Sequence, residues 1–313
     1  MRIFVAGGTG VVGRPLVRAL VSHGHQVTAS THRADSMPVV ADLGAQPVVM
    51  NGLDDDAVRR AVLDSAPEVI INQVTSLAAP AHDYRSWIAL TNRLRREGTA
   101  ILMSAARDAG ARRVIAQSAS FMTEPVGAGP TDESSPLYLD GPEPLRSHAR
   151  ANHAAEEQVT GMPGIEGVVL RYGFLYGAGT AIGPGGDIAT AVQAGEMPIA
   201  GDGAGRYPFL HVDDAVSATV QAVSRGAAGI YNVVDDEPAA QADWLPYLAE
   251  LLGAPAPRRL PEEQIEERFG VQAVYYGNQL RAAGNARAKA QLALTLAYPS
   301  WRLGFKEVFA QNT

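Results

Sequence analysis

Four glycines within seven residues, directly after an apolar run, constrain this chain more than any other feature. Residues Arg2–Ala6 are rich in β-formers and predict a buried strand, and the letters GGTGVVG follow them. A helical stripe of apolar residues at 16–21 then ends at Gly24, and His25–Ser30 predicts a second strand. Strand, glycine turn, helix and strand, in this order, predict a dinucleotide-binding βαβ unit.

Three of the four glycines have separate roles in such a unit. Gly7 permits the tight turn, Gly10 leaves room for a pyrophosphate, and Gly13 lets the helix pack closely on the strand. The helix N-terminus adds free N–H groups and a partial positive charge. The spacing is GxxGxxG rather than GxGxxG, and an ordinary tight turn is the alternative interpretation. The residues expected at the phosphates are Gly7, Thr9, Gly10, Val11, Val12 and Gly13.

Strand and helix signals keep alternating along the chain, which predicts an α/β fold with a Rossmann-type, doubly wound parallel sheet. Further strands are expected at Pro47–Met50, Val69–Val74, Arg113–Ser118, Gly167–Arg171 and Ile230–Val233. Helices are expected at Asp54–Leu63, Asp83–Ala109, Ser147–Thr160, Asp187–Gly195, Asp243–Leu252 and Pro261–Phe269, with a last amphipathic helix in the tail. A loop is expected at 121–146, and a hairpin-like loop leading into a helix at 201–223.

The regular alternation of strand and helix signals ends near Tyr176, where a glycine-rich stretch begins. We expect a dinucleotide-binding domain over residues 1–175 and a smaller, mainly substrate-binding lobe over 176–313. Segments at about 210–235 are expected to return to the first domain. Ligands of doubly wound sheets bind at the carboxyl ends of the strands, so the substrate is expected between the two parts.

Composition excludes several classes of partner. The 313 residues carry a formal net charge of −7, which argues against nucleic acid, and they include no cysteine. No apolar run reaches the ~18–20 residues of a membrane span, and Met1 leads directly into a strand without a visible signal peptide. We therefore expect a cytoplasmic monomer or homodimer with a small-molecule substrate. His211, Asp213 and Asp214 open a helix, where the aspartates suit capping better than a metal, and no metal is expected.

Several later segments, taken together with the glycine turn, resemble one family. They are GLDDDAV, VIAQSAS, TDESSPL, VVLRYGFLYGAG, FLHVDDAVSATVQAV and GIYNVVDDEP. The chain is thereby similar to the extended short-chain dehydrogenase/reductases, also called the NAD-dependent epimerase/dehydratase proteins. The resemblance implies further contacts to a nicotinamide cofactor at Asn51, Gly52, Leu53, Val74, Thr75, Gln117, Tyr172 and Phe174. It implies substrate contacts at Ser120, Phe121, Tyr176 and Tyr207.

The chain departs from this family at its catalytic pair, YxxxK. Alignment on the Ala-Glu that follows the motif puts His148 at the tyrosine position and Asn152 at the lysine position. A shift of one residue would give Ala149 and His153, which restores neither. The only two lysines are Lys289 and Lys306. The family's serine is retained as Ser118. In this respect the chain resembles atypical polyketide ketoreductases of the angucyclinone 7-ketoreductase type, which lack the pair.

The proton donor therefore stays open at this stage. His148 is a competent general acid by residue type, or it only fills the space of the missing tyrosine. Asn152 could bind a ribose hydroxyl, and Ser118 could hold a substrate carbonyl oxygen. Tyr172 or Tyr176 could supply a phenol, and a phenol of the substrate could protonate its own alkoxide.

The end of the second strand predicts which dinucleotide binds. Enzymes specific for NAD place an acidic residue there to hold the ribose 2′-OH. This chain has Thr31, His32 and Arg33, with no acid before Asp35, which suits the 2′-phosphate of NADP(H). The predicted function is an NADPH-dependent ketoreductase for a bulky aromatic or polycyclic secondary metabolite. The alternatives are a non-catalytic NADP(H)-binding sensor or scaffold and a sugar-nucleotide epimerase or dehydratase.

Overall fold

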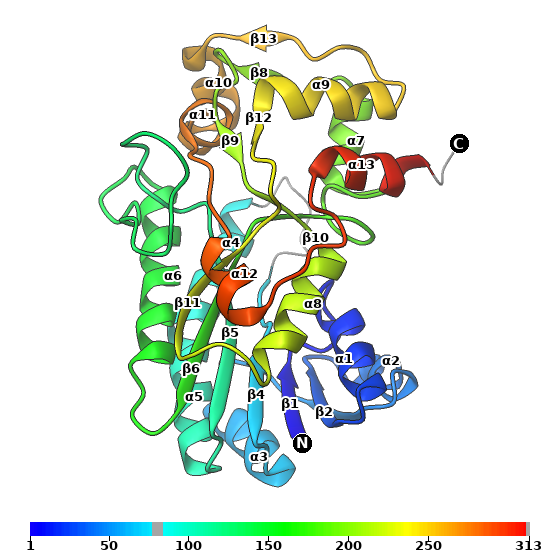
Figure 1. Ribbon diagram of the computed structural model, residues 1–313, viewed down its shortest axis with the longest axis vertical. Coiled ribbons are helices and arrows are strands. Elements are labelled where there is room, and N and C mark those ends of the chain that lie inside the picture. Colours follow the sequence, from blue (N-terminus) through cyan, green and yellow to red (C-terminus); the bar gives the residue numbers. More distant parts are fainter. Residues whose placement is uncertain (77–83, 311–313) are drawn as a thin grey trace.

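The computed structural model describes residues 1–76 and 84–310, with the side chains of residues 84–87 excepted. Its centre is a seven-stranded sheet in which every neighbouring pair is parallel. The order across the sheet is β11 (Gly229–Val233), β6 (Glu166–Tyr172), β5 (Arg113–Ala119), β4 (Val69–Asn72), β1 (Arg2–Ala6), β2 (Gln26–Thr31) and β3 (Gln46–Val49). The predicted Rossmann-type sheet is confirmed (Figure 1).

Helices cover both faces of this sheet. One face carries α1 (Gly13–Ser22), α2 (Met37–Asp42), α8 (Val212–Ala222) and α12 (Ala286–Leu292). The other carries α3 (Asp55–Ser65), α5 (Thr99–Asp108) and α6 (Leu145–Thr160), and α4 (Tyr84–Arg93) contacts α6. Both faces of the sheet are therefore buried, which is the usual state of a parallel sheet.

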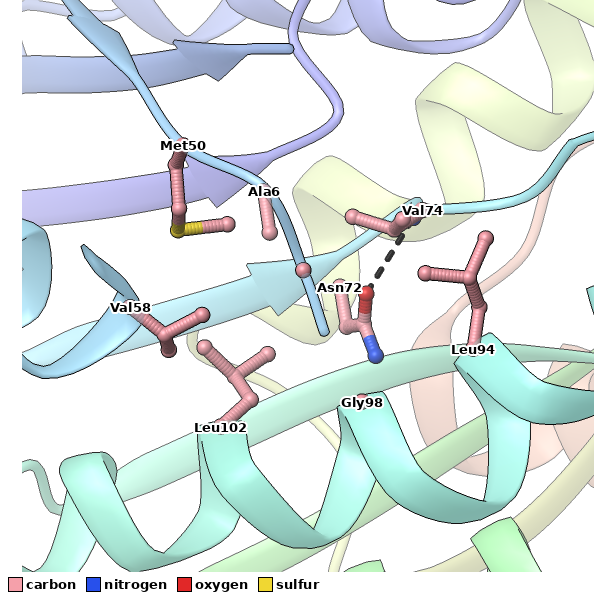
Figure 2. A pocket seen from close by; sticks show the side chains of 9 residues that line it. Ala6, Met50, Val58, Asn72, Val74, Leu94, Gly98 and Leu102 are labelled. Carbon is pink, nitrogen blue, oxygen red and sulfur yellow. Dashed lines mark hydrogen bonds between the residues drawn. The ribbon is translucent and has the colours of Figure 1, made fainter. Parts of the chain in front are cut away.

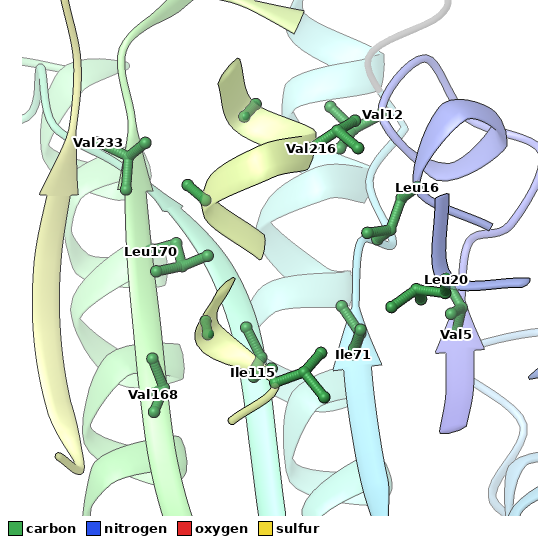
Figure 3. Packing of buried hydrophobic residues seen from close by; sticks show 14 of the residues in the cluster. Val5, Val12, Leu16, Leu20, Ile71, Ile115, Val168, Leu170, Val216 and Val233 are labelled. Atoms are coloured by element: carbon green, nitrogen blue, oxygen red, sulfur yellow. The ribbon is translucent and has the colours of Figure 1, made fainter. Parts of the chain in front are cut away.

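The alternation along β1 shows how the sequence divides between the two faces. Ile3 and Val5 pack in the cluster beneath α1 and α8, whereas Phe4 and Ala6 pack in the cluster beneath α3 and α5. Successive side chains of a strand point to opposite faces, so a short continuous apolar run supplies both layers. Figure 3 shows the first cluster, where Leu16 and Leu20 of α1 meet apolar side chains of the strands.

The smaller lobe lies at the end of the molecule opposite the N-terminus (Figure 1). Three two-stranded pairings occur in it: β7 (Phe174–Tyr176) with β10 (Phe209–His211), β9 (Arg206–Tyr207) with β12 (Ala239–Ala240), and β8 (Ile199–Ala200) with β13 (Arg259–Leu260). Its helices are α7 (Asp187–Gln193), α9 (Gln241–Leu251), α10 (Glu262–Phe269), α11 (Val271–Val274) and α13 (Trp301–Ala310). Aromatic side chains dominate its core, with Trp244, Trp301 and Phe305 fully buried.

The long helix is confirmed with one irregularity, whereas the expected hairpin is wrong. The helix expected at Asp83–Ala109 is interrupted by a π-helical turn, Leu94–Gly98, between α4 and α5, and Asp83 itself lies outside the described residues. A Cβ at Gly98 would lie 3.0 Å from the Gly52 carbonyl oxygen, so this turn packs closely on the loop after β3. The expected hairpin near 201–223 is absent from the described residues, because β9 pairs antiparallel with β12 and β10 pairs parallel with β7.

Short elements were also missed. The 3₁₀ turn Ala34–Ser36 with α2, and α12 in the tail, have fewer than eight residues each, too few for a clear hydrophobic period. The division of the chain at residue 175 stays a prediction. Within the described residues, β11 is an edge strand of the main sheet, α8 packs on α1, and α12 packs on β11.

Candidate functional site

The glycine turn between β1 and α1 has the geometry that its sequence predicts. Gly7 has a φ of +88°, and a Cβ at Gly13 would lie only 2.1 Å from the Gly7 carbonyl oxygen. Ser30 at the end of β2 fixes the turn, because its Oγ accepts a hydrogen bond of 3.1 Å from the Gly7 N–H. Helix α1 begins after Val12 without a side-chain cap, so no side chain of the helix competes with an anion at its N-terminus.

A small pocket opens beside this turn. It lies between the carboxyl end of β4, the loop after β3 and the helices of the other face, and Figure 2 shows its side chains. Gly52 and Val74 line it, as expected for the adenine side of a dinucleotide. The sequence missed most of the other lining residues, which come from distant elements: Ala6, Met50, Val58, Asn72, Leu94, Gly98 and Leu102.

The remaining residues expected at the cofactor lie along the same edge of the sheet. Asn51 is exposed and its Oδ1 accepts a hydrogen bond of 3.1 Å from the Leu53 N–H. Val74 is held by a bond of 3.1 Å from its N–H to Asn72 Oδ1. Four of the expected residues are half-buried, namely Thr9, Leu53, Thr75 and Gln117. Gly10 and Val11 are exposed.

The end of β2 presents a guanidinium to solvent. Thr31 is buried, whereas His32 and Arg33 are exposed. Arg33 pairs with Asp35, its Nε lying 3.0 Å from Oδ1, and this hydrogen bond lowers the pKa of Asp35 to about 2. The carboxylate that faces Arg33 is therefore that of Asp35, which lies in the 3₁₀ turn Ala34–Ser36 and not at the end of β2.

Ser118 lies at the carboxyl end of β5, but its hydroxyl points into the protein. Its Oγ lies 2.7 Å from Glu156 Oε1 and 3.1 Å from Asn152 Oδ1. A hydroxyl has one proton, and the charged, nearer carboxylate is the stronger acceptor. Arg171 binds the same carboxylate through Nε at 2.8 Å and Nη2 at 2.6 Å. The structure therefore connects Ser118 to a buried ion pair between α6 and β6.

Asn152 and His148 lie one helical turn apart on α6. Asn152 is buried, and its amide nitrogen donates to the His148 carbonyl oxygen over 2.9 Å. His148 is 7% exposed, and its Nε2 lies 2.8 Å from Nη1 of Arg95 in the π-helical turn. Burial, and then the positive charge of Arg95, hold the pKa of His148 well below its usual range. The imidazole is neutral at physiological pH and is a poor proton donor.

The tyrosines considered as proton donors are occupied or enclosed. Tyr172 is buried, and its hydroxyl is bonded to Gln73 Nε2 at 3.1 Å and to Thr219 Oγ1 at 2.5 Å. Tyr176 is fully buried in the aromatic core of the smaller lobe, against Gly304. Burial raises the pKa of both phenols. Tyr207 is also buried in that core, so neither Tyr176 nor Tyr207 presents a surface to a substrate here.

Half-buried aromatic rings do occur beyond the ends of β5 and β6. Phe121 and Phe174 are stacked with ring centroids 4.1 Å apart, and Tyr276 meets Phe174 edge-to-face at 5.6 Å. Ser120 precedes Phe121, is buried, and donates to the Tyr172 carbonyl oxygen over 3.2 Å. Tyr276 lies in the π-helical turn Tyr275–Gln279, a region where the sequence offered no motif. We call Phe121, Phe174 and Tyr276 the aromatic wall.

The motif HVDD does not cap its helix as expected. The N-cap residue of α8 is His211, whose Nδ1 accepts from the Asp213 N–H over 3.1 Å. Asp214 is buried and accepts from the backbone N–H groups of Ala297 and Tyr298, at 2.7 and 3.0 Å. It holds the C-terminal segment onto α8. Within residues 1–76 and 84–310, no cluster of His, Cys, Asp or Glu could hold a metal ion.

Comparison with known proteins agrees with this geometry. The profile of the NAD dependent epimerase/dehydratase family matches residues 3–234, and the chain belongs to that family. A 3-diazoavenalumate denitrifying reductase from a Streptomyces species is 45% identical over 304 residues, which cover 97% of this chain and 99% of that protein. A 4-hydroxy-2-methyl-3-oxo-4-farnesyl-3,4-dihydroquinoline-1-oxide ketoreductase from Stigmatella aurantiaca is 29% identical over 82% of this chain and 75% of that protein.

Solved structures share the fold. Human epimerase family protein SDR39U1, crystallised with NADPH, has a TM-score of 0.78 and 21% identity, with 100% of both chains covered. With the family and the reductases among its relatives, the chain is an NAD(P)H-dependent oxidoreductase that acts on a small molecule. The part of the structure that is described contains no helix long and apolar enough to cross a membrane.

The residues present fit a nicotinamide dinucleotide. Gly13 has no room for a side chain, and Gly10, whose Cβ would meet only the Gly7 oxygen at 3.5 Å, leaves the approach to α1 open. Apolar side chains, among them Met50 and Leu94, form most of the lining of the pocket, which suits an adenine ring. The glycine turn would hold the pyrophosphate and this pocket the adenine.

Proposed function

We propose that the chain is an NADPH-dependent reductase that removes nitrogen from an aromatic diazo acid. One observation carries this proposal: His148 and Asn152, which the sequence alignment gives to the family's tyrosine and lysine positions, are a buried, neutral histidine and a buried asparagine. The site therefore offers no strong acid to a reacting oxygen. A reaction whose product needs no proton from the protein suits these residues best.

Reductive denitrification is such a reaction. When bound, the reduced nicotinamide supplies a hydride. Replacement of a diazonium group by hydride forms a C–H bond and breaks the C–N bond, whose electron pair leaves with N₂. No alkoxide is formed, and the protein has to move no proton. The relative that is 45% identical bears a name that describes the reductive loss of nitrogen from a diazo acid, which supports this reaction.

The chain's own residues would hold and orient such a substrate. The aromatic wall of Phe121, Phe174 and Tyr276 lies directly beyond Ser120 and β6, at the strand ends where ligands of this fold bind. Stacked and edge-to-face rings provide flat apolar surface for another ring. With a substrate bound against it, an apolar wall of this kind would keep water from a reactive diazonium carbon. These contacts support an aromatic substrate.

Arg33 supports NADP(H) over NAD(H). Its guanidinium is exposed at the end of β2, and no carboxylate precedes Asp35 there. A planar guanidinium binds phosphate in a bidentate manner, whereas a ribose 2′-OH requires an acceptor.

Ketone reduction is the second candidate. The ketoreductase that is 29% identical favours it. A ketone would leave an alkoxide that must take up a proton, and neither the neutral His148 nor the enclosed Tyr176 suits that task. A hydroxyl of the substrate next to the ketone would then have to provide the proton. A non-catalytic sensor is disfavoured by similarity to a reductase over nearly the whole chain, and an epimerase by the missing tyrosine and lysine.

The deciding experiment compares two probes with one carboxylate each: 3-carboxybenzenediazonium labelled with ¹⁵N, and 3-acetylbenzoate. NADPH carrying deuterium at C4 is the reductant, and mixtures without protein or without NADPH correct for spontaneous loss of nitrogen. We expect protein-dependent release of ¹⁵N₂ and deuterium on the ring carbon. Deuterium only in the alcohol from the ketone would favour the second candidate, and NADPH binding without turnover of either probe would favour a sensor.

A further inference from the structure

Two cationic or basic side chains from different elements meet inside the protein, next to Ala149, whose cluster Phe121 and Tyr276 of the aromatic wall pack against. Arg95 belongs to the π-helical turn Leu94–Gly98, and His148 to the first part of α6. They are 8% and 7% exposed, and Nη1 of Arg95 lies 2.8 Å from Nε2 of His148. π-Helical turns inside helices are frequent at functional sites, because they turn a side chain away from its regular position.

The contact fixes the tautomer of the imidazole. A guanidinium has only donors, so Nε2 of His148 must be the acceptor and its proton must be on Nδ1. Nδ1 is buried and has no acceptor among the described residues, so a ligand oxygen can reach it only when the side chains that cover it move. A buried N–H without an acceptor costs about 1–3 kcal/mol, which is a reason to expect that a ligand supplies one.

The charges around His148 keep it neutral. Arg95 is the charged group that acts on it, from the turn packed against α6. Glu156, on α6 itself, is bound by Arg171 of β6 and by Ser118 of β5. Asn152, one turn along α6, carries no charge. Because no described carboxylate contacts His148, nothing there favours the imidazolium.

We infer that the Nδ1–H of His148, polarised by the guanidinium of Arg95 behind it, donates a hydrogen bond to a negatively charged oxygen of the substrate. This inference rests on the proposed function, because it requires a substrate that carries a negatively charged oxygen, such as the carboxylate of an aromatic diazo acid. The histidine binds and orients that oxygen without giving up its proton. Arg95 acts through the histidine and is a positioning residue. A neutral imidazole whose second nitrogen is bound to a cation is a stronger donor than an isolated one.

The tautomer is tested without any substrate, by two-dimensional NMR of the histidine ring nitrogens in ¹⁵N-labelled protein. We expect one ring with a protonated Nδ1 and an unprotonated Nε2 that does not titrate between about pH 5.5 and 8. The signal is assigned by its loss in His148→Phe. An imidazolium, or a ring protonated on Nε2, would overturn the inference whatever the enzyme reduces.

The hydrogen bond to a ligand is tested with naphthalene-2-carboxylate, an aromatic acid without a reducible group, in the presence of NADP⁺. We expect it to shift the Nδ1 signal of His148, and its dissociation constant to rise about tenfold in His148→Phe and in Arg95→Met. His148→Asn keeps an N–H donor near the same place and should recover most of the binding. An unchanged Nδ1 signal with bound ligand contradicts the inference.

His153→Phe is the matched control, since His153 lies on the same helix and is half-exposed, with Glu157 as its partner. It should leave binding and turnover unchanged, and an equal loss in His153→Phe and His148→Phe would overturn the inference. The negatively charged oxygen can be a carboxylate of the substrate or an oxygen that becomes charged during the reaction. Steady-state kinetics with whichever probe of the preceding section the protein reduces separates these two sources. A carboxylate bound from the outset raises KM in His148→Phe with kcat kept, whereas an oxygen that becomes charged during reduction lowers kcat by a similar factor. If neither kinetic constant changes, His148 does not contact the substrate.

Discussion

Arg171 binds both carboxylate oxygens of Glu156, with Nε 2.8 Å from Oε1 and Nη2 2.6 Å from Oε2. Their side chains are 5% and 2% exposed, and the pair joins β6 to α6 below the proposed site. The carbonyl oxygen of Glu133 and the hydroxyl of Ser118 are further partners of this pair. The ion pair therefore holds together four segments that are distant in the sequence.

Breaking this ion pair should destabilise the protein strongly. Glu156→Gln leaves the guanidinium of Arg171 buried without its counter-charge, which costs about 3–5 kcal/mol in comparable cases. We expect a loss of that size in the free energy of unfolding, measured by urea titration. Glu97→Gln is the control, because Glu97 pairs with Arg93 at the surface and its replacement should leave the free energy of unfolding nearly unchanged. Equal losses in the two variants would show that the buried ion pair contributes no more to stability than the exposed one.

Ser118→Ala should reduce stability more than activity. The hydroxyl donates to a buried carboxylate, a bond worth about 1.5–3 kcal/mol, and it points away from the strand end. We expect the free energy of unfolding to fall by about that amount while kcat/KM stays within about threefold of the wild type. A loss of two orders of magnitude in kcat with an unchanged unfolding curve would instead restore Ser118 as a catalytic residue.

The sequence predicted the sheet well, for a physical reason. A glycine turn after an apolar strand and the alternation of apolar runs with helical stripes depend on neighbouring residues only. The direction of a side chain at the end of a strand depends on what packs against it. Ser118 and Phe121 are three residues apart. The hydroxyl of Ser118 is nevertheless hydrogen-bonded to Glu156, whereas the ring of Phe121 lies in the aromatic wall. No pattern within β5 distinguishes these outcomes.

The sequence also missed residues that have no local motif. Arg95 stands in a run of charged residues, and its side chain is nevertheless buried, because the π-helical turn brings it against His148. Tyr276 comes to Phe174 from a segment about a hundred residues later in the chain. Buried arginine and π-helical geometry are tertiary effects. The one signal in the sequence was the absence of the family's lysine. Without it, other side chains must surround that part of α6.

Gly10 and Gly13 should respond differently to the same added methyl group. In Gly13→Ala the new Cβ would lie 2.1 Å from the Gly7 oxygen, so α1 must shift and both the unfolding temperature and NADPH binding should fall. In Gly10→Ala the nearest atom is 3.5 Å away, so the fold should be kept. We expect that variant to bind NADPH at least about tenfold more weakly by calorimetry, because the methyl group occupies the approach of the pyrophosphate. Undiminished binding in Gly10→Ala would contradict the proposed position of the cofactor.

Arg33 should decide between the two dinucleotides. Arg33→Ala removes the guanidinium at the end of β2, and we expect the preference for NADPH over NADH to fall about tenfold, with NADH binding nearly unchanged. Asp35→Asn removes the carboxylate that competes for that guanidinium, and it should tighten NADPH binding. Because the pKa of Asp35 is lowered to about 2, its carboxylate stays ionised at any working pH and the effect should not vary with pH. A wild type that binds NADH more tightly than NADPH would refute the assignment.

Asp235 should make the protein less stable as the pH rises. It follows β11 and is buried, and burial, with smaller contributions from the charges of Glu237 and Asp236, raises its pKa to about 9. An unfolded aspartate has a pKa near ~3.9, so between about pH 4 and 9 the folded state holds a proton that the unfolded state has lost. This contribution to stability is complete below the unfolded pKa and is lost as the pH rises toward the folded one, by at most about 1.4 kcal/mol per pH unit.

Asp235→Asn keeps the shape and removes the titration. We therefore expect the variant to lose less stability than the wild type between pH 6 and 9, and to have the higher unfolding temperature at the alkaline end. Thermal unfolding monitored by circular dichroism at several pH values measures both curves. Asp236→Asn is the matched control, because Asp236 is the next residue, is partly exposed and pairs with Lys289. Parallel curves for wild type and Asp235→Asn would mean that Asp235 is ionised in the folded protein, with the backbone N–H groups of Trp301 and Glu237 stabilising its charge.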